Sequence, residues 1–315
     1  MTWEMFLGAS VFAATLRLAT PIALAALGGT MTERSGVTNI ALEGSMLVGC
    51  FFGVVAADRS HSVWIGLGVA LLAGVLLAAL HAYASITLRA DQIVSGMALN
   101  ILALGLTTYL DYQMYGTTGT PPDLPAVPDL HLTFLGGVPY VGDAIADQNS
   151  IVWLTLLLVV ALQLFLFRTV LGLRWRAVGE HPRAAETVGI QVRRLRYAAV
   201  LASGALSALG GAYLSLGVAH SFTDGMTSGR GFIGLAAMIF GRWTPVGALA
   251  ASLIFGYGNA LSTSLQGATV GDVRVPVQLL GTLPYVLTIL AVAGFVGRSR
   301  PPAADGLPYE TEGQA

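Results

Sequence analysis

The chain has 315 residues, of which 55% are hydrophobic and only 10% are charged, and its formal net charge is -1. Soluble domains carry about 25% charged residues, so this composition excludes an ordinary soluble fold. All 16 basic residues are Arg, and the absence of Lys excludes both a P-loop ATPase site and Schiff-base chemistry. Apolar stretches long enough to cross a bilayer indicate a polytopic α-helical membrane protein.

Nine apolar segments predict an all-α membrane helix bundle of about eight to nine transmembrane segments. Their approximate bounds are 10–30, 41–57, 63–88, 93–113, 151–168, 197–217, 231–241, 244–264 and 275–297. Arg17 and Pro21 interrupt the first segment, so part of residues 1–16 is expected to lie along the interface. The seventh is too short to span and is interpreted as a half-helix, a feature typical of transport sites.

The predicted membrane domain covers residues 1–297, and the polar, Pro-rich residues 298–315 are expected to form a disordered cytoplasmic tail. Arg residues indicate the orientation. With the N-terminus outside, twelve Arg fall in inner loops and three in outer loops. Positive charge favours the cytoplasmic side, so we expect the N-terminus outside and the C-terminus inside a plasma membrane.

The longest predicted outer connection covers residues 114–150 and contains four Asp and five Pro but no Arg. A solvated loop and a docking surface for an external protein both explain this composition. A weak internal similarity relates Ile22–Gly53 to Gly231–Ala260. Each stretch has an apolar run, a basic turn and a second apolar run, a pattern typical of transporter repeats.

Polar residues inside apolar segments are candidates for a translocation path, because each needs a partner or water. We select Asn39, Glu43, Asn100 and Asn259. Two alternatives stay open. Glu43 could be a carboxylate near the inner interface, satisfied by backbone N–H groups or by Arg34. The two deeper Asn residues could simply join helices by hydrogen bonds.

Enzymatic chemistry has no support in the sequence. The five His residues are scattered, no pair has metal-ligand spacing, and no nucleophile elbow is present. We therefore expect no catalytic residue, no metal and no cofactor in this chain.

The most charged stretch, Gly179–Val200, lies between two apolar segments. Pro182 suits the first turn of a helix and Gly189 its end. Ala184, Ala185 and Val188 are expected to share an outward face of this short helix. Such a helix has little reason to form alone, so it is interpreted as docking on a partner, with a simple positive-inside anchor as the alternative.

Three motifs resemble one family in the correct chain order. RAVGEHPRAAETVGI looks like the coupling-helix loop in permease subunits of ATP-binding-cassette importers. ALGGTMTERSGVTNIALEGSML resembles the N-terminal signature of the nucleoside and simple-sugar branch, and GRGFIGLAAMIFGRWTPVGALAASLIFG resembles its C-terminal half. The resemblance covers nearly all of residues 10–297.

This resemblance implies a translocation path for a nucleoside or a simple sugar, with the nucleoside preferred. It implies that Gly179, Glu180, Pro182, Ala185 and Gly189 couple the chain to a separate cytoplasmic ATPase, which uses the ATP. The other implied partners are a second, different permease subunit, an extracytoplasmic binding lipoprotein and membrane lipid, with no nucleic acid. The competing hypothesis is an ion-coupled secondary transporter of a small polar solute, for which Glu43 and Asp111 are the candidate coupling carboxylates.

Overall fold

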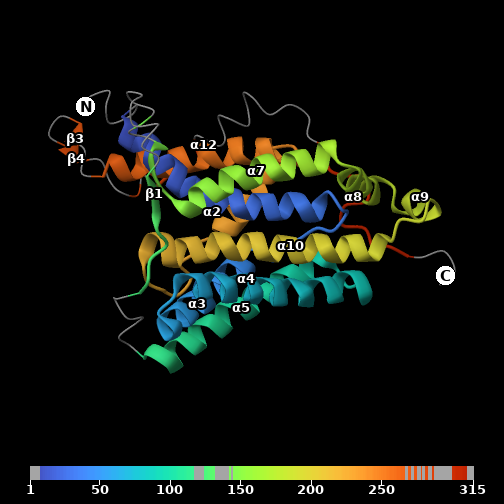
Figure 1. Ribbon diagram of the computed structural model, residues 1–315, viewed down its shortest axis with the longest axis horizontal. Coiled ribbons are helices and arrows are strands. Elements are labelled where there is room, and N and C mark those ends of the chain that lie inside the picture. The colour runs from blue at the N-terminus through green and yellow to red at the C-terminus, as the bar shows by residue number, and fades with distance from the viewer. Residues whose placement is uncertain are drawn as a thin grey trace.

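The computed structural model describes residues 8–116, 124–131, 142, 145–266, 269–270, 273–274, 278, 281–282, 286 and 300–310. Long helices lie side by side, roughly along the longest axis of the molecule (Figure 1). One end of this bundle carries strand β1 (Asp129–His131) and the other carries helix α9 (Pro182–Thr187) (Figure 1). We call them the β1 end and the α9 end.

The remaining elements follow in chain order. They are α2 (Ala9–Glu33), α3 (Leu42–Ser60), α4 (Val63–Ala82) with the π-helical η1 (Tyr83–Thr87), α5 (Gln92–Tyr115), β2 (Asp147–Asn149), α7 (Ser150–Arg168), α8 (Val170–Glu180), α10 (Val192–Ala212) with the π-helical η2 (Tyr213–Ala219), α11 (Arg230–Phe240), α12 (Pro245–Ser264), β3 (Thr269–Val270) and β4 (Val273–Arg274). The described chain is thus mostly helical, as the sequence predicted.

Six helices in the described residues are long and apolar enough to cross a membrane: α2, α4 with η1, α5, α7, α10 with η2, and α12. The expected half-helix is α11, an apolar helix of 11 residues. Helix α3 has 19 residues but carries three charged side chains. Most of the ninth predicted segment, 275–297, lies outside the described residues, so the count of eight to nine stays a prediction.

Helix α2 is continuous, which corrects the expected interruption at Arg17 and Pro21. It begins at Ala9, and residues 9–16 belong to it rather than to a separate interfacial segment. Pro21 removes one backbone donor, but the residue is buried, and its carbonyl lies against Gly210 of α10. Packing along most of its length therefore keeps this helix intact.

Polar residues begin several of the spans. Asp91 accepts hydrogen bonds from the N–H groups of Ile93 and Val94, both 2.9 Å long, at the start of α5. Asn149 caps α7 in the same way, and Thr244 caps α12 directly before a proline in its first turn. These caps satisfy backbone donors that a helix start leaves without partners.

Glycines bring the central helices into close contact. A Cβ atom on Gly211 of α10 would lie 1.9 Å from the carbonyl oxygen of Met46 in α3. A Cβ atom on Gly74 of α4 would lie 2.5 Å from the carbonyl oxygen of Gly204 in α10. Helix α10 therefore packs backbone to backbone on two neighbours, as small residues allow in membrane bundles.

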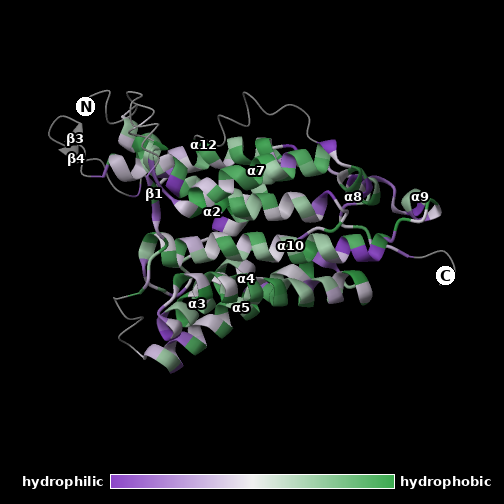
Figure 2. Cartoon of the chain, in the orientation of Figure 1, coloured by the Kyte–Doolittle hydropathy of each residue, from purple (hydrophilic) through white to green (hydrophobic). Residues whose placement is uncertain are grey.

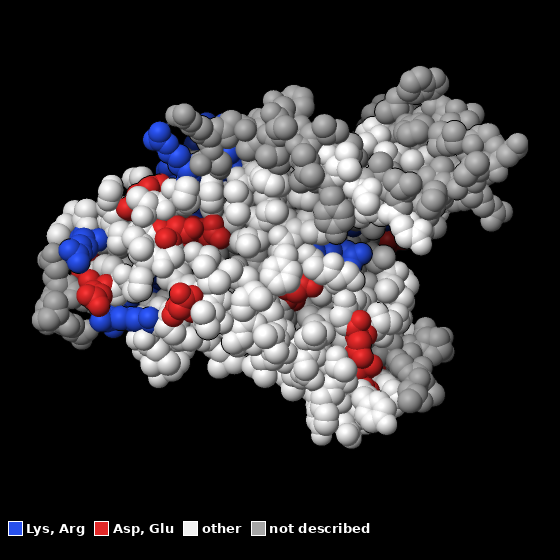
Figure 3. Space-filling view, turned by 180° about the vertical axis from the view of Figure 1, so that it is seen from behind, with Lys and Arg blue, Asp and Glu red and all other residues white. Residues whose placement is uncertain are grey.

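Hydrophilic residues gather at the α9 end, over α8, α9 and the start of α10 (Figure 2). Seen from behind, most of the visible Arg side chains also lie toward this end, which is then on the left (Figure 3). The two basic turns of the internal similarity meet there as well. Arg34 donates from Nε to the carbonyl of Trp243 at 2.7 Å and from a terminal nitrogen to that of Arg242 at 3.2 Å.

Candidate functional site

The segment between α2 and α3, residues 34–41, turns back into the bundle, and we call it the re-entrant link. After α2 ends, the chain turns at Gly36, where φ is +82°, and continues without helical structure to Ala41. Val37, Asn39 and Ala41 are each at most 1% exposed. Non-helical backbone at this depth has to find its hydrogen bonds within the protein.

Asn100 supplies two of those hydrogen bonds. Its Nδ2 donates to the carbonyl of Ile40 at 3.0 Å, and its Oδ1 accepts from the N–H of Gly44 at 2.7 Å. Asn100 is the ninth residue of α5, so the contact lies about 12 Å along that helix at a rise of 1.5 Å per residue. One side chain therefore fixes the junction between the re-entrant link and α3, well inside the bundle.

Three further side chains hold the link. The carboxamide oxygen of Gln92 accepts from the N–H of Thr38 at 2.7 Å, and Nε2 of His81 lies 3.1 Å from the carbonyl of Thr38. Asn39 accepts from the N–H of Ala41 at 2.9 Å and donates to the hydroxyl of Ser203 on α10 at 3.1 Å. Asn39 thus binds the link to a second helix while it closes a local turn.

Glu43 lies in the first turn of α3 and faces the N-terminal end of the half-helix α11. Its Oε1 accepts from the hydroxyl of Thr227 at 2.6 Å and from the N–H of Gly229 at 2.8 Å, and its Oε2 accepts from the N–H of Gly231 at 2.6 Å. The N-terminus of a helix attracts negative charge, so the carboxylate stabilises α11 in this position.

This arrangement corrects the expected surroundings of Glu43. Backbone N–H groups do satisfy the carboxylate, but they belong to another helix, and Arg34 instead binds the carbonyls at the α11–α12 turn. Glu43 also lies away from the end of the bundle, since Gly234, one turn into α11, packs on Ala25 and Ile22 near the middle of α2.

The structure brings together three of the four predicted path residues. Asn39, Glu43 and Asn100 all lie where the re-entrant link joins α3, and we call them the junction cluster. Asn259 is separate: it lies on α12 and donates at 3.1 Å to the carbonyl of Phe255, one turn earlier in its own helix. Sequence reasoning missed Thr227 and the two glycine donors, because only the fold brings α11 to Glu43.

At the α9 end, α8 and α9 form a helical elbow that contains four of the five predicted coupling residues, and the fifth, Gly189, follows it. Pro182 starts α9, and Gly189, at φ +81°, follows its end. Gly179 is in α8, where a Cβ atom would lie 2.3 Å from the carbonyl oxygen of Arg34. This contact joins the elbow directly to the re-entrant link.

The expected outward face of α9 is split. Ala185 is only 4% exposed and packs inward with Val178, Val192 and Tyr309. Ala184 is exposed, and Val188, just beyond α9, is 75% exposed. The inward position of Ala185 follows from the direction in which the elbow folds onto α10, which the short sequence pattern did not define.

Residues 300–310 dock on the bundle through buried Pro302, Ala304 and Tyr309, whereas the sequence suggested a disordered tail from 298 onward; residues 311–315 lie outside the described part. The N–H of Ala304 donates to the carbonyl of Gly179 at 2.9 Å, and the N–H of Ala303 donates to the carboxylate of Glu180 at 3.2 Å. Tyr309 is 7% exposed. Gly179 and Glu180 therefore accept hydrogen bonds from the C-terminal part of the chain, on which Ala185 also packs.

The β1 end carries a small antiparallel hairpin from the long connection 114–150, pairing Asp129 with Asn149. His131 and Asp147 face each other across it, with 2.7 Å between Nδ1 and Oδ1. The hydrogen bond to this carboxylate raises the pKa of His131. In the described residues no group of three His, Cys, Asp or Glu side chains could hold a metal ion.

Comparison with known proteins gives the family. The family described as branched-chain amino acid transport system / permease component matches residues 11–292. The guanosine ABC transporter permease protein NupQ of Bacillus subtilis is 42% identical and aligns over 94% of this chain and 95% of its own. The nucleoside ABC transporter permease protein NupC of Lactococcus lactis is 37% identical over 95% of this chain and 96% of its own.

A further relative carries a different cargo in its name. The putative glucose ABC transporter permease protein TsgC13 of Haloferax volcanii is 34% identical over 94% of this chain and 94% of its own. The family match nevertheless covers most of the chain, and both nucleoside relatives align over nearly their whole length. The chain therefore belongs to the permease component family of the branched-chain amino acid transport system type, a family of membrane transport proteins.

Proposed function

We propose that this chain is the permease subunit of an ABC importer that carries nucleosides across the plasma membrane. The observation that supports this best is the 42% identity to a guanosine permease along nearly the whole of both chains. In this proposal the chain supplies the path and no chemistry, and a separate ATPase hydrolyses ATP.

The junction cluster is our candidate for the path. It presents a carboxylate, two carboxamides and the start of a half-helix, all inside the bundle. Such groups can exchange hydrogen bonds with a neutral polar solute as it passes. A nucleoside fits this chemistry, because it is uncharged and offers ribose hydroxyls and base edges. Asn259, which bonds within its own helix, is a weaker candidate.

A simple sugar remains the second candidate cargo, because it offers the same hydroxyl chemistry and a relative that aligns over nearly the whole chain carries glucose in its name. An ion-coupled secondary transporter is disfavoured, because the two nucleoside relatives that align over nearly the whole chain are ABC transporter permeases. The nucleoside proposal is tested with the reconstituted importer in liposomes. We expect uptake of labelled guanosine that needs ATP and survives collapse of ion gradients. Uptake of glucose alone, or uptake driven by an ion gradient without ATP, would overturn it.

The α8–α9 elbow is our candidate for the contact with the ATPase, with Val188 and Ala184 on its exposed side. We expect Val188→Asp to lower ATP-driven uptake and ATPase binding without loss of the protein from the membrane, because this side chain is exposed. Unchanged co-purification of the ATPase with the Val188→Asp variant would refute this role.

Two further partners complete the proposed importer: a second permease that differs from this chain, and a binding lipoprotein at the β1 end. Co-purification in mild detergent would identify both.

The proposed orientation puts the β1 end outside and the α9 end in the cytoplasm. It rests on twelve inner against three outer Arg residues. A single reporter cysteine tests it, because Cys50 is buried and can be replaced by Ala. We expect an impermeant maleimide to label Leu130→Cys in intact cells, and Val188→Cys only after the cells are opened. The reverse pattern would invert the topology.

A further inference from the structure

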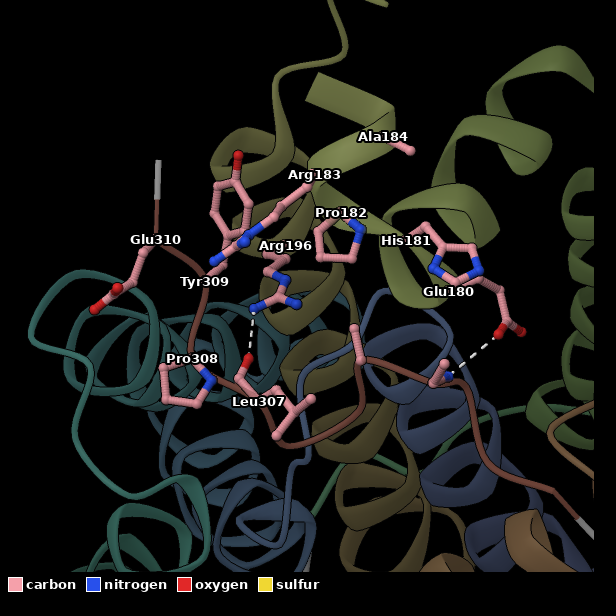
Figure 4. A pocket seen from close by; sticks show the side chains of 12 residues that line it. Glu180, His181, Pro182, Arg183, Ala184, Arg196, Leu307, Pro308, Tyr309 and Glu310 are labelled. Atoms are coloured by element: carbon pink, nitrogen blue, oxygen red, sulfur yellow. Dashed lines mark hydrogen bonds between the residues drawn. The ribbon is translucent and has the colours of Figure 1, made fainter. Parts of the chain in front are cut away.

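Residues 300–310, which we call the C-terminal strap, cross the α9 end and contact two separate parts of the protein. On one side they bind the α8–α9 elbow, and on the other they bind the re-entrant link. The close view in Figure 4 shows Glu180 near one end of the strap, Arg196 beside its middle, and Tyr309 on the strap toward the other end. The inference below rests on the proposed transport function.

The strap binds the elbow at its two edges. Ala303 and Ala304 donate to Glu180 and Gly179 at one edge, at 3.2 and 2.9 Å. At the other edge the hydroxyl of Tyr309 donates to the carboxylate of Glu186 in α9. Burial and this hydrogen bond raise the pKa of Tyr309 to about 12, so the phenol remains a neutral donor at physiological pH. Between the two edges lies a groove of about 710 Å³ (Figure 4).

The strap binds the re-entrant link through Asp305. The hydroxyl of Thr38 donates to Oδ1 of Asp305 at 3.1 Å. Asp305 also lies next to Glu33, the last residue of α2, and the two carboxyl groups interact. Thr38 is two residues from Ile40, whose carbonyl is held by Asn100. A continuous set of bonded groups therefore leads from α9 through the strap to the junction cluster.

Contacts with a buried arginine stabilise the strap in its docked position. Arg196 of α10 is 1% exposed and donates to the carbonyl of Leu307 at 3.0 Å. Its guanidinium carbon lies 5.7 Å from the centre of the Tyr309 ring, and Asp305 supplies a nearby negative charge. In the described residues, Nε and one terminal nitrogen of Arg196 have no hydrogen-bond partner. Without the strap this cation would lose a carbonyl, an aromatic ring and the negative charge of Asp305.

We propose that the C-terminal strap is a positioning element of transport, which makes α9 and the re-entrant link move together. If a partner displaced the α8–α9 elbow, the hydrogen bonds of Tyr309 to α9 and of Ala304 to α8 would move the strap with it. The bond between Asp305 and Thr38 would then move the re-entrant link. Tyr309, Asp305 and Thr38 are then positioning residues: they act on the path through the link and do not contact the cargo.

The test compares two variants that each remove one hydrogen bond of the strap, one on the side of α9 and one on the side of the re-entrant link. Tyr309→Phe removes the bond to α9, and Thr38→Val removes the bond to the link while nearly preserving its shape. Both uptake and ATP hydrolysis are measured on the reconstituted importer. We expect each variant to lower the amount of nucleoside carried per ATP about fivefold, the effect of losing about one hydrogen bond, while hydrolysis continues. The matched control is Glu310→Gln, which removes only the exposed pair with Arg89.

The double variant decides whether the bonds act in series. If the movement of α9 reaches the link through Tyr309 and then Thr38, loss of either bond interrupts that route, so Tyr309→Phe with Thr38→Val should be no worse than one variant alone. Multiplied losses, equal falls in uptake and hydrolysis, or unchanged transport in both single variants would overturn the proposal. A wild-type importer without ATP-driven uptake would instead refute the proposed function, so the two failures are distinguishable.

Discussion

Replacement of Asn100 by Leu tests how the re-entrant link is held. The wild-type side chain donates to the carbonyl of Ile40 and accepts from the N–H of Gly44. Leu has a similar volume but can do neither, so two backbone groups lose their partners. Each buried group left without a partner costs about 1–3 kcal/mol, so we expect the free energy of unfolding to fall by about 2–6 kcal/mol.

The matched control is Asn259→Leu. Asn259 donates to the carbonyl of Phe255, which already belongs to the hydrogen-bond ladder of α12. Its loss should therefore cost less than about 1 kcal/mol. Asn100→Asp is an intermediate case, because it keeps the acceptor for Gly44 and loses the donor to Ile40. Thermal unfolding of the purified permease in one detergent gives the order of the three variants.

The uptake of these variants adds a second measurement. We expect Asn100→Leu to lose transport together with stability, because the link that it holds reaches the junction cluster. Asn259→Leu should insert normally and transport at close to the wild-type rate. If Asn259→Leu unfolds as early as Asn100→Leu, or if Asn100→Leu is as stable as the wild type, the reasoning from unpaired backbone groups is wrong.

Three further predictions concern charge, packing and pH. Glu43→Gln removes the negative charge at the start of α11. It should therefore lower the free energy of unfolding by about 1–2 kcal/mol and reduce uptake. Unchanged thermal unfolding would contradict this. Gly211→Ala should lower the free energy of unfolding by about 1–3 kcal/mol, since its Cβ would meet a carbonyl oxygen of α3 at 1.9 Å. The control Gly105→Ala has nothing within 4 Å of its Cβ and should leave that free energy unchanged or raise it slightly. Because the pKa of His131 is raised, the stabilisation of the hairpin is present at low pH and is lost as pH rises through that pKa. NMR titration should show a lower pKa for His131 after Asp147→Asn, and no change would refute the pairing.

The membrane class and most of the helices could be predicted from the sequence. Apolar stretches of sufficient length have one stable form in lipid, because a helix satisfies its own backbone groups. The half-helix α11 was predicted for the same reason, since 11 apolar residues cannot span a bilayer. The break expected at Pro21 was wrong, because tight packing against α10 holds the helix together although Pro21 lacks a backbone donor.

The candidate site was predicted only in part. Asn39, Glu43 and Asn100 could be selected, since a polar side chain among apolar residues needs a partner. Their partners could not be named, because the backbone donors at the start of α11 lie about 190 residues from Glu43 in the chain. The inward position of Ala185 and the docked strap were missed for a related reason: a short segment with few apolar residues is ordered only by what it packs against.

The sequence by itself determined that the chain is a helical membrane protein, because composition is a local property, and the missing Lys predicted that it has no P-loop ATPase site. It also gave the approximate helix positions. The tertiary structure alone decided that the segment after α2 returns into the bundle, that Glu43 holds the half-helix, and that residues 300–310 bridge α9 and Thr38. Each of these depends on hydrogen bonds between groups far apart in the chain, which form only when the helices have packed.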